Sequence, residues 1–299
     1  MSGKSQDGVL GAASAMGLAT FFSRILGLVR EQVFAVLFGA GNATDAFNVA
    51  FRIPNLLRDL FAEGAMSAAL VPTFTRVREE GGARAGWRLA GLVFRALFGV
   101  VSVLALFGVF FSEELVGLYA SSYRSIPGKF EQTVQMTRIM FPFFPLVALA
   151  AAYMGVLNAL GKFFLPGFAS ALFNLSSIIV GVTGSFLAPR LGFPPIYGMA
   201  VGVVLGGLVQ AFCQLPELRR QGYRWQPRAA DEAPWYRDRG LRRIGALMIP
   251  GMMGLAATQI NVLVNTILAT SQGAGAVSWL NYAFRLMQFP IGIFGVALA

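Results

Sequence analysis

Long apolar segments alternate with short polar ones along the whole chain. Eight of the apolar segments are long enough to cross about 30 Å of hydrocarbon as helices, which takes roughly 20 residues each. They lie near residues 8–38, 43–75, 88–112, 132–157, 164–187, 196–216, 241–270 and 277–299. Turns that contain glycine or proline, at 39–42 and 193–195, mark two of the boundaries. The pattern predicts an all-α polytopic membrane protein with eight transmembrane helices.

The composition excludes several classes of enzyme. The chain has 299 residues, of which 56% are hydrophobic and 13% charged, whereas soluble domains have about 25% charged residues. It contains no histidine, which removes histidine-based acid–base catalysis and histidine metal ligands, and its single cysteine, Cys213, cannot form an intramolecular disulfide. No phosphate-binding glycine loop or separate catalytic carboxylate pair is evident. We expect a protein that is not an enzyme and that uses neither a cofactor nor a metal.

The basic residues are distributed unevenly between the two sets of loops. Of the 24 basic residues, fourteen lie at Lys4, Lys162 and in the segments 76–88 and 217–243. Only three, Arg124, Lys129 and Arg190, lie in the alternate loops, which are predicted to face outward. Loops rich in Lys and Arg stay in the cytoplasm, so the N-terminus is predicted to be cytoplasmic. The net charge of +10 does not indicate nucleic acid, because the basic residues lie between apolar runs and form no soluble face.

One motif occurs twice. The first copy consists of Gly39–Gly41 and then Asn48–Arg52 (NVAFR). The second copy consists of Gly273–Gly275 and then Asn281–Arg285 (NYAFR), at offsets of 234 and 233 residues from the first. Transporters commonly contain such repeats as two lobes related by an axis along the membrane normal. The repeat predicts a first lobe at 1–218, a cytoplasmic linker at 219–240 and the start of a second lobe at 241–299, within a longer protein of at least twelve helices.

Seven arginines fall inside apolar segments. Each costs about 2.5 to 3.5 kcal/mol at the centre of a membrane, so they must face protein or water. Arg95 and Arg138 lie near segment ends, where they can reach the interface. The deeper five are Arg24, Arg30, Arg52, Arg58 and Arg285.

Helical periodicity places these arginines on polar stripes. One stripe contains Asp45, Asn48, Arg52, Asn55, Asp59 and Glu63; a second contains Thr20, Arg24, Gly27 and Glu31; a third contains Ser278, Asn281, Arg285 and Gln288. The stripes indicate a shared hydrated cavity. Its acids could simply pair with arginines, Glu31 with Arg24 and the acids Asp45 and Asp59 with Arg52. We favour such pairing for Glu31, Asp59 and Glu63. The arginines outnumber those acids, and the planar guanidinium group suits phosphate, so an anion site is the preferred interpretation.

Several blocks of sequence resemble the lipid II flippases of the MurJ (MviN) family. They are Ser23–Glu31 (SRILGLVRE), Phe38–Phe47 (FGAGNATDAF), Pro54–Ala65 (PNLLRDLFAEGA), Val277–Trp279 (VSW) and Arg285–Pro290 (RLMQFP). The resemblance implies a member of the multidrug/oligosaccharidyl-lipid/polysaccharide exporter superfamily, with two six-helix lobes and a central cationic cavity. Such proteins move the undecaprenyl-diphosphate-linked disaccharide-peptide from the inner to the outer leaflet of the bacterial cytoplasmic membrane by alternating access.

The resemblance also implies which residues bind the substrate. The cavity arginines of the family correspond to Arg24, Arg30, Arg58 and Arg285, and its acid on the second span to Asp45. With Arg52 and Ser278 from the polar stripes, these seven residues form the candidate substrate-binding set. Some relatives bind a cation near the seventh span, where this chain has only the neutral Asn261 and Asn265, so no metal site is expected.

Two other functions remain open at this stage. The chain could be a multidrug or other polysaccharide-lipid exporter of the same superfamily, or a membrane scaffold that transports nothing. Cationic drugs require acidic or aromatic cavities, so the arginines favour an anionic substrate. Moving an anion outward gains about 2.3 kcal/mol per charge per 100 mV of an inside-negative potential, which predicts transport driven by the membrane potential.

Overall fold

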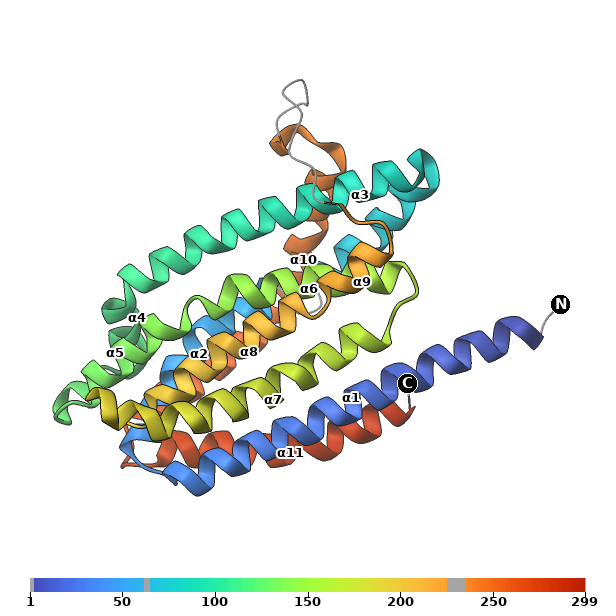
Figure 1. The fold of residues 1–299 in the computed structure, drawn as a ribbon. Helices are drawn as coiled ribbons and strands as arrows, with labels where there is room; N and C mark the ends of the chain where they lie inside the picture. The colour runs from blue at the N-terminus through green and yellow to red at the C-terminus, as the bar shows by residue number, and fades with distance from the viewer. Residues whose placement is uncertain (1–2, 62–64, 225–234, 299) are drawn as a thin grey trace.

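Helices form almost all of the computed structural model, which describes residues 3–61, 65–224 and 235–298, and these residues include no strand. The longer helices are α1 (Gly3–Phe38), α2 (Asn42–Phe61), α3 (Ala65–Phe110), α5 (Lys129–Met140), α6 (Phe143–Ala159), α7 (Phe164–Leu187), α8 (Tyr197–Phe212), α10 (Arg239–Thr270) and α11 (Ala276–Leu298). The shorter elements are α4 (Ser112–Ala120), η1 (Ser121–Ser125), η2 (Ala188–Leu191), α9 (Leu215–Arg220) and η3 (Trp235–Arg237). Most helices lie side by side with roughly parallel axes (Figure 1).

One predicted loop is wrong, and one predicted span contains a break. The segment 76–88, predicted to be a loop, is helical within α3, and the chain reverses at Gly82, whose φ of 78° and ψ of 175° are not helical. An ion pair of 2.7 Å between Arg76 and Glu80, one helical turn apart, supports the helix there. The predicted span 132–157 comprises two helices, α5 and α6, because Pro142 provides no N–H to continue the first.

Five segments of the described chain are long and apolar enough to cross a membrane. They are Asn42–Phe110, Lys129–Ala159, Phe164–Leu191, Tyr197–Arg220 and Arg239–Thr270. The first runs from α2 through both arms of α3 and therefore contains two of the predicted spans. The chain is a multi-pass helical membrane protein, and the count of eight spans remains a prediction.

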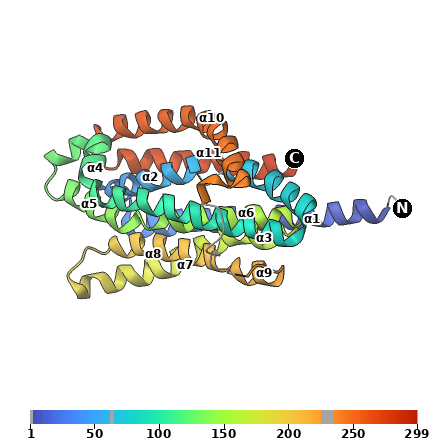
Figure 2. The same ribbon diagram turned by 90° about the horizontal axis from the view of Figure 1, so that it is seen from above.

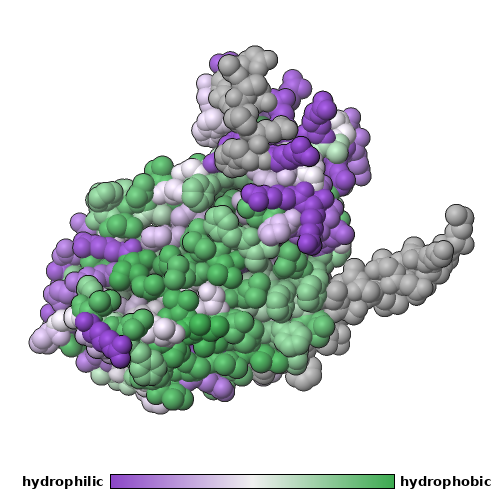
Figure 3. Space-filling view, in the orientation of Figure 1, coloured by the Kyte–Doolittle hydropathy of each residue, from purple (hydrophilic) through white to green (hydrophobic). Residues whose placement is uncertain are grey.

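The connections between helices gather at two opposite ends of the molecule. At one end the reversal of α3 meets the segment after α9, where the Trp87 ring lies 5.8 Å from the ring of Tyr223. At the other end Lys129 contacts Asn42, and Ser122 donates to the carbonyl of Thr270 at 2.7 Å. Figure 3 shows hydrophilic residues at both ends and a broad apolar belt between them. The belt is the surface expected to face lipid, and the end that faces the cytoplasm remains a prediction.

Helix α6 lies at the centre of the bundle. In the most apolar part of Lys129–Ala159, 72% of the residues are buried, against 6% in that of α10. Viewed from above, α7 and α8 lie on one side of this centre and α10 and α11 on the other (Figure 2). Helix α11 packs against α1 and α2, which brings the second copy of the repeat next to the first.

Glycines allow α7 and α8 to approach closely. A Cβ atom added to Gly198 would lie 2.1 Å from the backbone nitrogen of Ser185, and one added to Gly202 would lie 2.8 Å from that of Gly181. Helices in membranes associate through small residues that let their backbones touch. The α7–α8 pair therefore forms one wall of the bundle. The short distance between the two helices depends on the glycines, which have no side chain.

Candidate anion-binding site

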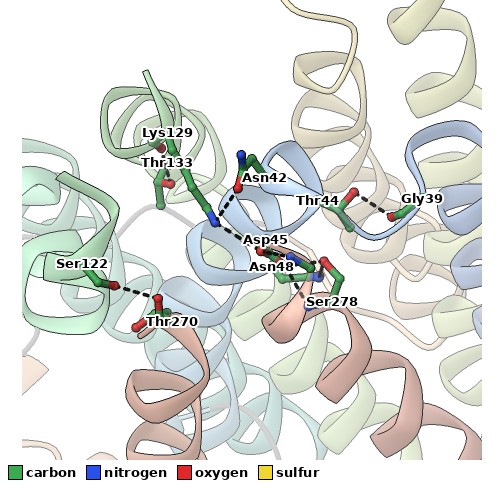
Figure 4. A network of polar contacts seen from close by, with 11 residues as sticks. Gly39, Asn42, Thr44, Asp45, Asn48, Ser122, Lys129, Thr133, Thr270 and Ser278 are labelled. Carbon is green, nitrogen blue, oxygen red and sulfur yellow. Dashed lines mark hydrogen bonds and ion pairs between the residues drawn. The ribbon is translucent and has the colours of Figure 1, made fainter. Parts of the chain in front are cut away.

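The two copies of the repeat meet through a buried network centred on Asp45 (Figure 4). The Asp45 carboxylate accepts from the backbone N–H groups of Gly275 at 2.7 Å and Ser278 at 2.9 Å, and from the Ser278 hydroxyl at 2.6 Å. Lys129 of α5 completes the network with an ammonium group 3.2 Å from Asp45 and 3.1 Å from the amide oxygen of Asn42. Asp45 thus caps the first turn of α11 and holds α2, α5 and α11 together at one end of the bundle.

Equivalent positions of the two copies contact each other. Asp45 and Ser278 are 233 residues apart, as are Asn48 and Asn281, whose side chains form a hydrogen bond of 3.3 Å. The Tyr282 hydroxyl donates to the Gly39 carbonyl at 3.1 Å. Residues that pair with their own equivalents indicate a local two-fold relationship between α2 and α11.

Next to this network lies a small polar pocket of about 50 Å³. Arg52 and Asn48 of α2 line it, together with their equivalents Arg285 and Asn281 of α11 and with Glu31 of α1. Its volume suffices for a few water molecules. The pocket is therefore the narrow end of the polar region between α1, α2 and α11.

A larger pocket of about 400 Å³ is lined by four of the five deep arginines. Arg24 and Arg30 of α1, Arg58 of α2 and Arg285 of α11 all line it, and it shares Arg30, Arg285 and Asn55 with the small pocket. The remaining walls come from α6, α7, α8 and Gln214, which directly precedes α9. Arginines from three helices thus converge on one region, although up to 261 residues separate them in sequence.

Two acids neutralise part of this positive charge. Glu31 lies 3.0 Å from Arg30 and 3.5 Å from Arg285. Asp59 lies 2.7 Å from Arg58 and also accepts hydrogen bonds from Asn55 and Gln259. The prediction that these acids pair with arginines is confirmed, but the expected partners Arg24 and Arg52 are wrong, because neighbouring arginines lie closer to the acids. The prediction for Glu63 lies outside the described residues.

The positive charge exceeds the negative charge around the two pockets. Within the described part of the chain, Arg24 and Arg52 form no ion pair, and the buried Nε atom of Arg24 has no hydrogen-bond partner. Hydrogen bonds between arginine and an anion are charge-assisted and stronger than neutral ones. The arrangement can therefore bind an anion at the larger pocket.

The structure separates the candidate residues into two groups. The five arginines line the pockets, whereas Asp45 and Ser278 line neither of them and bond to each other.

Sequence reasoning missed Lys129, which it assigned to an outward loop, because its partner Asp45 lies 84 positions away. It also missed the side-chain amides of Asn174, Gln210 and Gln214 in the wall of the larger pocket. A polar side chain inside an apolar segment is the sequence feature that could have identified these three residues.

The fold and the pocket define a multi-pass helical membrane protein with the architecture of transporters. A crystal structure of a MATE protein in complex with MaD3S has a TM-score of 0.70 at 15% identity, and the match covers 96% of this chain and 63% of that one. The family described as lipid II flippase MurJ matches residues 34–299, and the chain belongs to this family.

Individual members of the family are similar over most of this chain. The probable lipid II flippase MurJ of Haemophilus influenzae is 38% identical over 287 residues, which are 94% of this chain and 54% of the relative. The lipid II flippase MurJ of Burkholderia cenocepacia is 39% identical, covering 93% and 53%. A lipid II flippase MurJ structure in an inward closed conformation has a TM-score of 0.74 at 27% identity, covering 93% of this chain and 55% of that one. The chain thus spans about half the length of these relatives.

Proposed function

We propose that the protein containing this chain moves an undecaprenyl-diphosphate-linked disaccharide-peptide, lipid II, from the inner to the outer leaflet of the bacterial cytoplasmic membrane. The observation that carries the proposal is the convergence of Arg24, Arg30, Arg58 and Arg285 on one pocket inside an apolar bundle. Membership of the MurJ family supports it.

In this proposal the arginines bind the diphosphate group. Arg24 has a buried Nε–H without a partner among the described residues, so a phosphate oxygen would satisfy a donor that burial otherwise penalises. Arg30 and Arg285 line both pockets, and Arg52 adds a further positive charge at the narrow end. Asp45 and Ser278 contribute indirectly, since their network holds α11, and with it Arg285, against α2.

Alternating access needs contacts that open and close at one end of the bundle. The Asp45 network joins the two copies of the repeat at the end opposite the reversal of α3. We propose that these contacts close the outward end while the larger pocket receives the substrate from the cytoplasmic side, with the N-terminus in the cytoplasm. The two-lobe division at 1–218 and 241–299, joined by the linker 219–240, belongs to the same proposal.

The membrane potential is the proposed driving force. A diphosphate carries net negative charge, so its outward movement gains about 2.3 kcal/mol per charge per 100 mV across an inside-negative membrane. The substrate then needs no nucleotide for export.

The test uses the full-length protein in liposomes loaded with lipid II. Export is measured from the lipid that becomes accessible outside, at imposed potentials of both signs, for the wild type and for Arg24→Glu. We expect export by the wild type that rises with an inside-negative potential, and none by the variant. Equal export by both proteins would contradict the arginine site, and export indifferent to the potential would contradict the driving force. Binding of cationic drugs in place of lipid II would favour a multidrug exporter.

A further inference from the structure

One wall of the larger pocket has side-chain amides whose oxygens point toward no donor. Gln214, only 1% exposed, donates from Nε2 to the carbonyls of Ala150 and Gln210, both at 3.1 Å. Its Oε1 atom is buried and accepts no hydrogen bond from the described residues. Because both partners of the nitrogen are carbonyl oxygens, rotating the amide would place two oxygens together, so this orientation is fixed.

Asn174 and Asn55 repeat the arrangement in the same pocket. Asn174 is 8% exposed and donates to the carbonyls of Ser23 at 3.2 Å and Ser170 at 3.1 Å, and no described residue donates to its oxygen. Asn55, also 8% exposed, donates to the carboxylate of Asp59, and its buried Oδ1 has no partner in the described chain. Three amides thus use their nitrogens on acceptors of the protein and retain oxygens that can accept.

Unpartnered buried acceptors require donors, which restricts the class of ligand. A diphosphate supplies only acceptors and would face these oxygens unfavourably. Cations are disfavoured by the four arginines of the same pocket. The remaining donors are neutral hydroxyl and amide N–H groups, which sugars carry on every face.

The pocket combines this amide wall with the unpartnered Nε–H of Arg24. Donors for a phosphate and acceptors for hydroxyl groups therefore lie in one space of about 400 Å³, within the range of roughly 300 to 1,000 Å³ typical of small-molecule sites. A glycosyl diphosphate has this combination of groups, because its first sugar is attached directly to a phosphate.

We infer that Gln214, Asn174 and Asn55 form a carbohydrate subsite that binds the first sugar of the lipid-linked substrate beside its diphosphate. The inference rests on the proposed function and assigns the sugar to the interior of the first lobe, between α2, α7 and the end of α8. Amides of the protein then recognise the sugar while arginines recognise the diphosphate, so the two groups contribute separately to affinity.

The experiment measures binding of two lipids that differ by one sugar. Full-length protein in nanodiscs is titrated with undecaprenyl diphosphate and with undecaprenyl-diphospho-N-acetylglucosamine, for the wild type, Gln214→Met and Asn174→Leu. Gln135→Met, which removes the hydrogen bond with the Tyr197 hydroxyl outside this pocket, is the control. Binding of the sugar-free lipid reports whether each variant is folded.

We expect each of the two amide variants to weaken binding of the sugar-bearing lipid about tenfold, equivalent to ~1.4 kcal/mol, and to leave binding of the sugar-free lipid unchanged. The control should bind both lipids as the wild type does. Equal weakening of both lipids, or no weakening of either, would overturn the carbohydrate subsite and leave the proposed function in place. A wild-type protein that binds neither lipid would overturn the proposed function itself.

Discussion

The amide nitrogen of Asn281 donates to the amide oxygen of Asn48 at 3.3 Å, and these two residues occupy the same position in the two copies of the repeat. The contact shows that the two similar stretches of sequence also lie side by side in the structure. One helical turn away, the Ser278 hydroxyl donates to its equivalent Asp45 at 2.6 Å, which locates the local two-fold axis between α2 and α11.

The Asp45–Lys129 ion pair should be essential for stability. Its side chains are 1% and 3% exposed, so Asp45→Asn leaves a buried ammonium group without its counter-charge and should lower the free energy of unfolding by about 3 to 5 kcal/mol. Adding Lys129→Met should restore part of the loss, because the unpaired charge is removed. Thermal unfolding in detergent measures both variants.

The pair Arg76–Glu80 provides the control for that measurement. It is shorter, at 2.7 Å against 3.2 Å, but its side chains are 56% and 62% exposed, so Glu80→Gln should change stability by less than about 0.5 kcal/mol. A loss of similar size at both pairs would show that burial is not what makes Lys129 and Asp45 important.

Lysine should not replace arginine at Arg24. Lysine preserves the charge and loses the planar set of donors, so Arg24→Lys should be inserted normally and transport about tenfold less, the loss of one charged hydrogen bond. Arg24 forms no ion pair with the described residues, so Arg24→Ala should also leave the protein level unchanged. Membrane abundance and growth of a strain dependent on the variant measure these effects.

Variants of Arg58 and Arg95 provide comparisons for the variants of Arg24. Arg58 pairs with Asp59 at 2.7 Å, so Arg58→Ala should lower the protein level as well as transport. Arg95 lines neither of the arginine pockets, and Arg95→Lys should leave level and transport intact. Full transport by Arg24→Lys would contradict bidentate recognition of phosphate. It would indicate that only the positive charge at this position is needed.

The close approach of α7 and α8 should tolerate no side chain at Gly198. A Cβ there would lie 2.1 Å from the Ser185 nitrogen, so Gly198→Val should force the helices apart and cost about 1 to 3 kcal/mol or more. Gly254 of α10 has no atom within 4 Å of its would-be Cβ, and Gly254→Ala should be neutral or stabilising. Melting temperatures in detergent compare the two.

Topology can be tested with single cysteines. In a Cys213→Ala background, Ser121→Cys and Arg84→Cys should react with a membrane-impermeant reagent from opposite sides, Arg84→Cys from the cytoplasm. The structure places the two positions at opposite ends of the bundle, in η1 and beside the reversal of α3. Labelling of both from one side would refute the predicted orientation of the first three spans.

The sequence predicted those parts of the molecule that local patterns determine. Apolar length alone located α7 and α10 to within about two residues, and helical periodicity placed the deep arginines on faces that meet. The burial of Lys129 depends on contacts with residues far away in sequence, so a polar residue near a turn looked like a solvent-exposed one. The direction of each side-chain amide is likewise a property of the packed structure, since only the neighbouring carbonyls fix which atom is left without a partner.

A duplicated segment that folds against its own copy must be chemically compatible with itself. Asparagine meets this condition because an amide can donate to an identical amide, whereas two carboxylates would repel each other, and the equivalent of Asp45 is the hydroxyl donor Ser278. Arginine also fails the condition, and yet Arg52 and Arg285 are counterparts beside the same small pocket. Their like charges are compatible at this interface because Glu31, which lines the same pocket, lies 3.5 Å from Arg285.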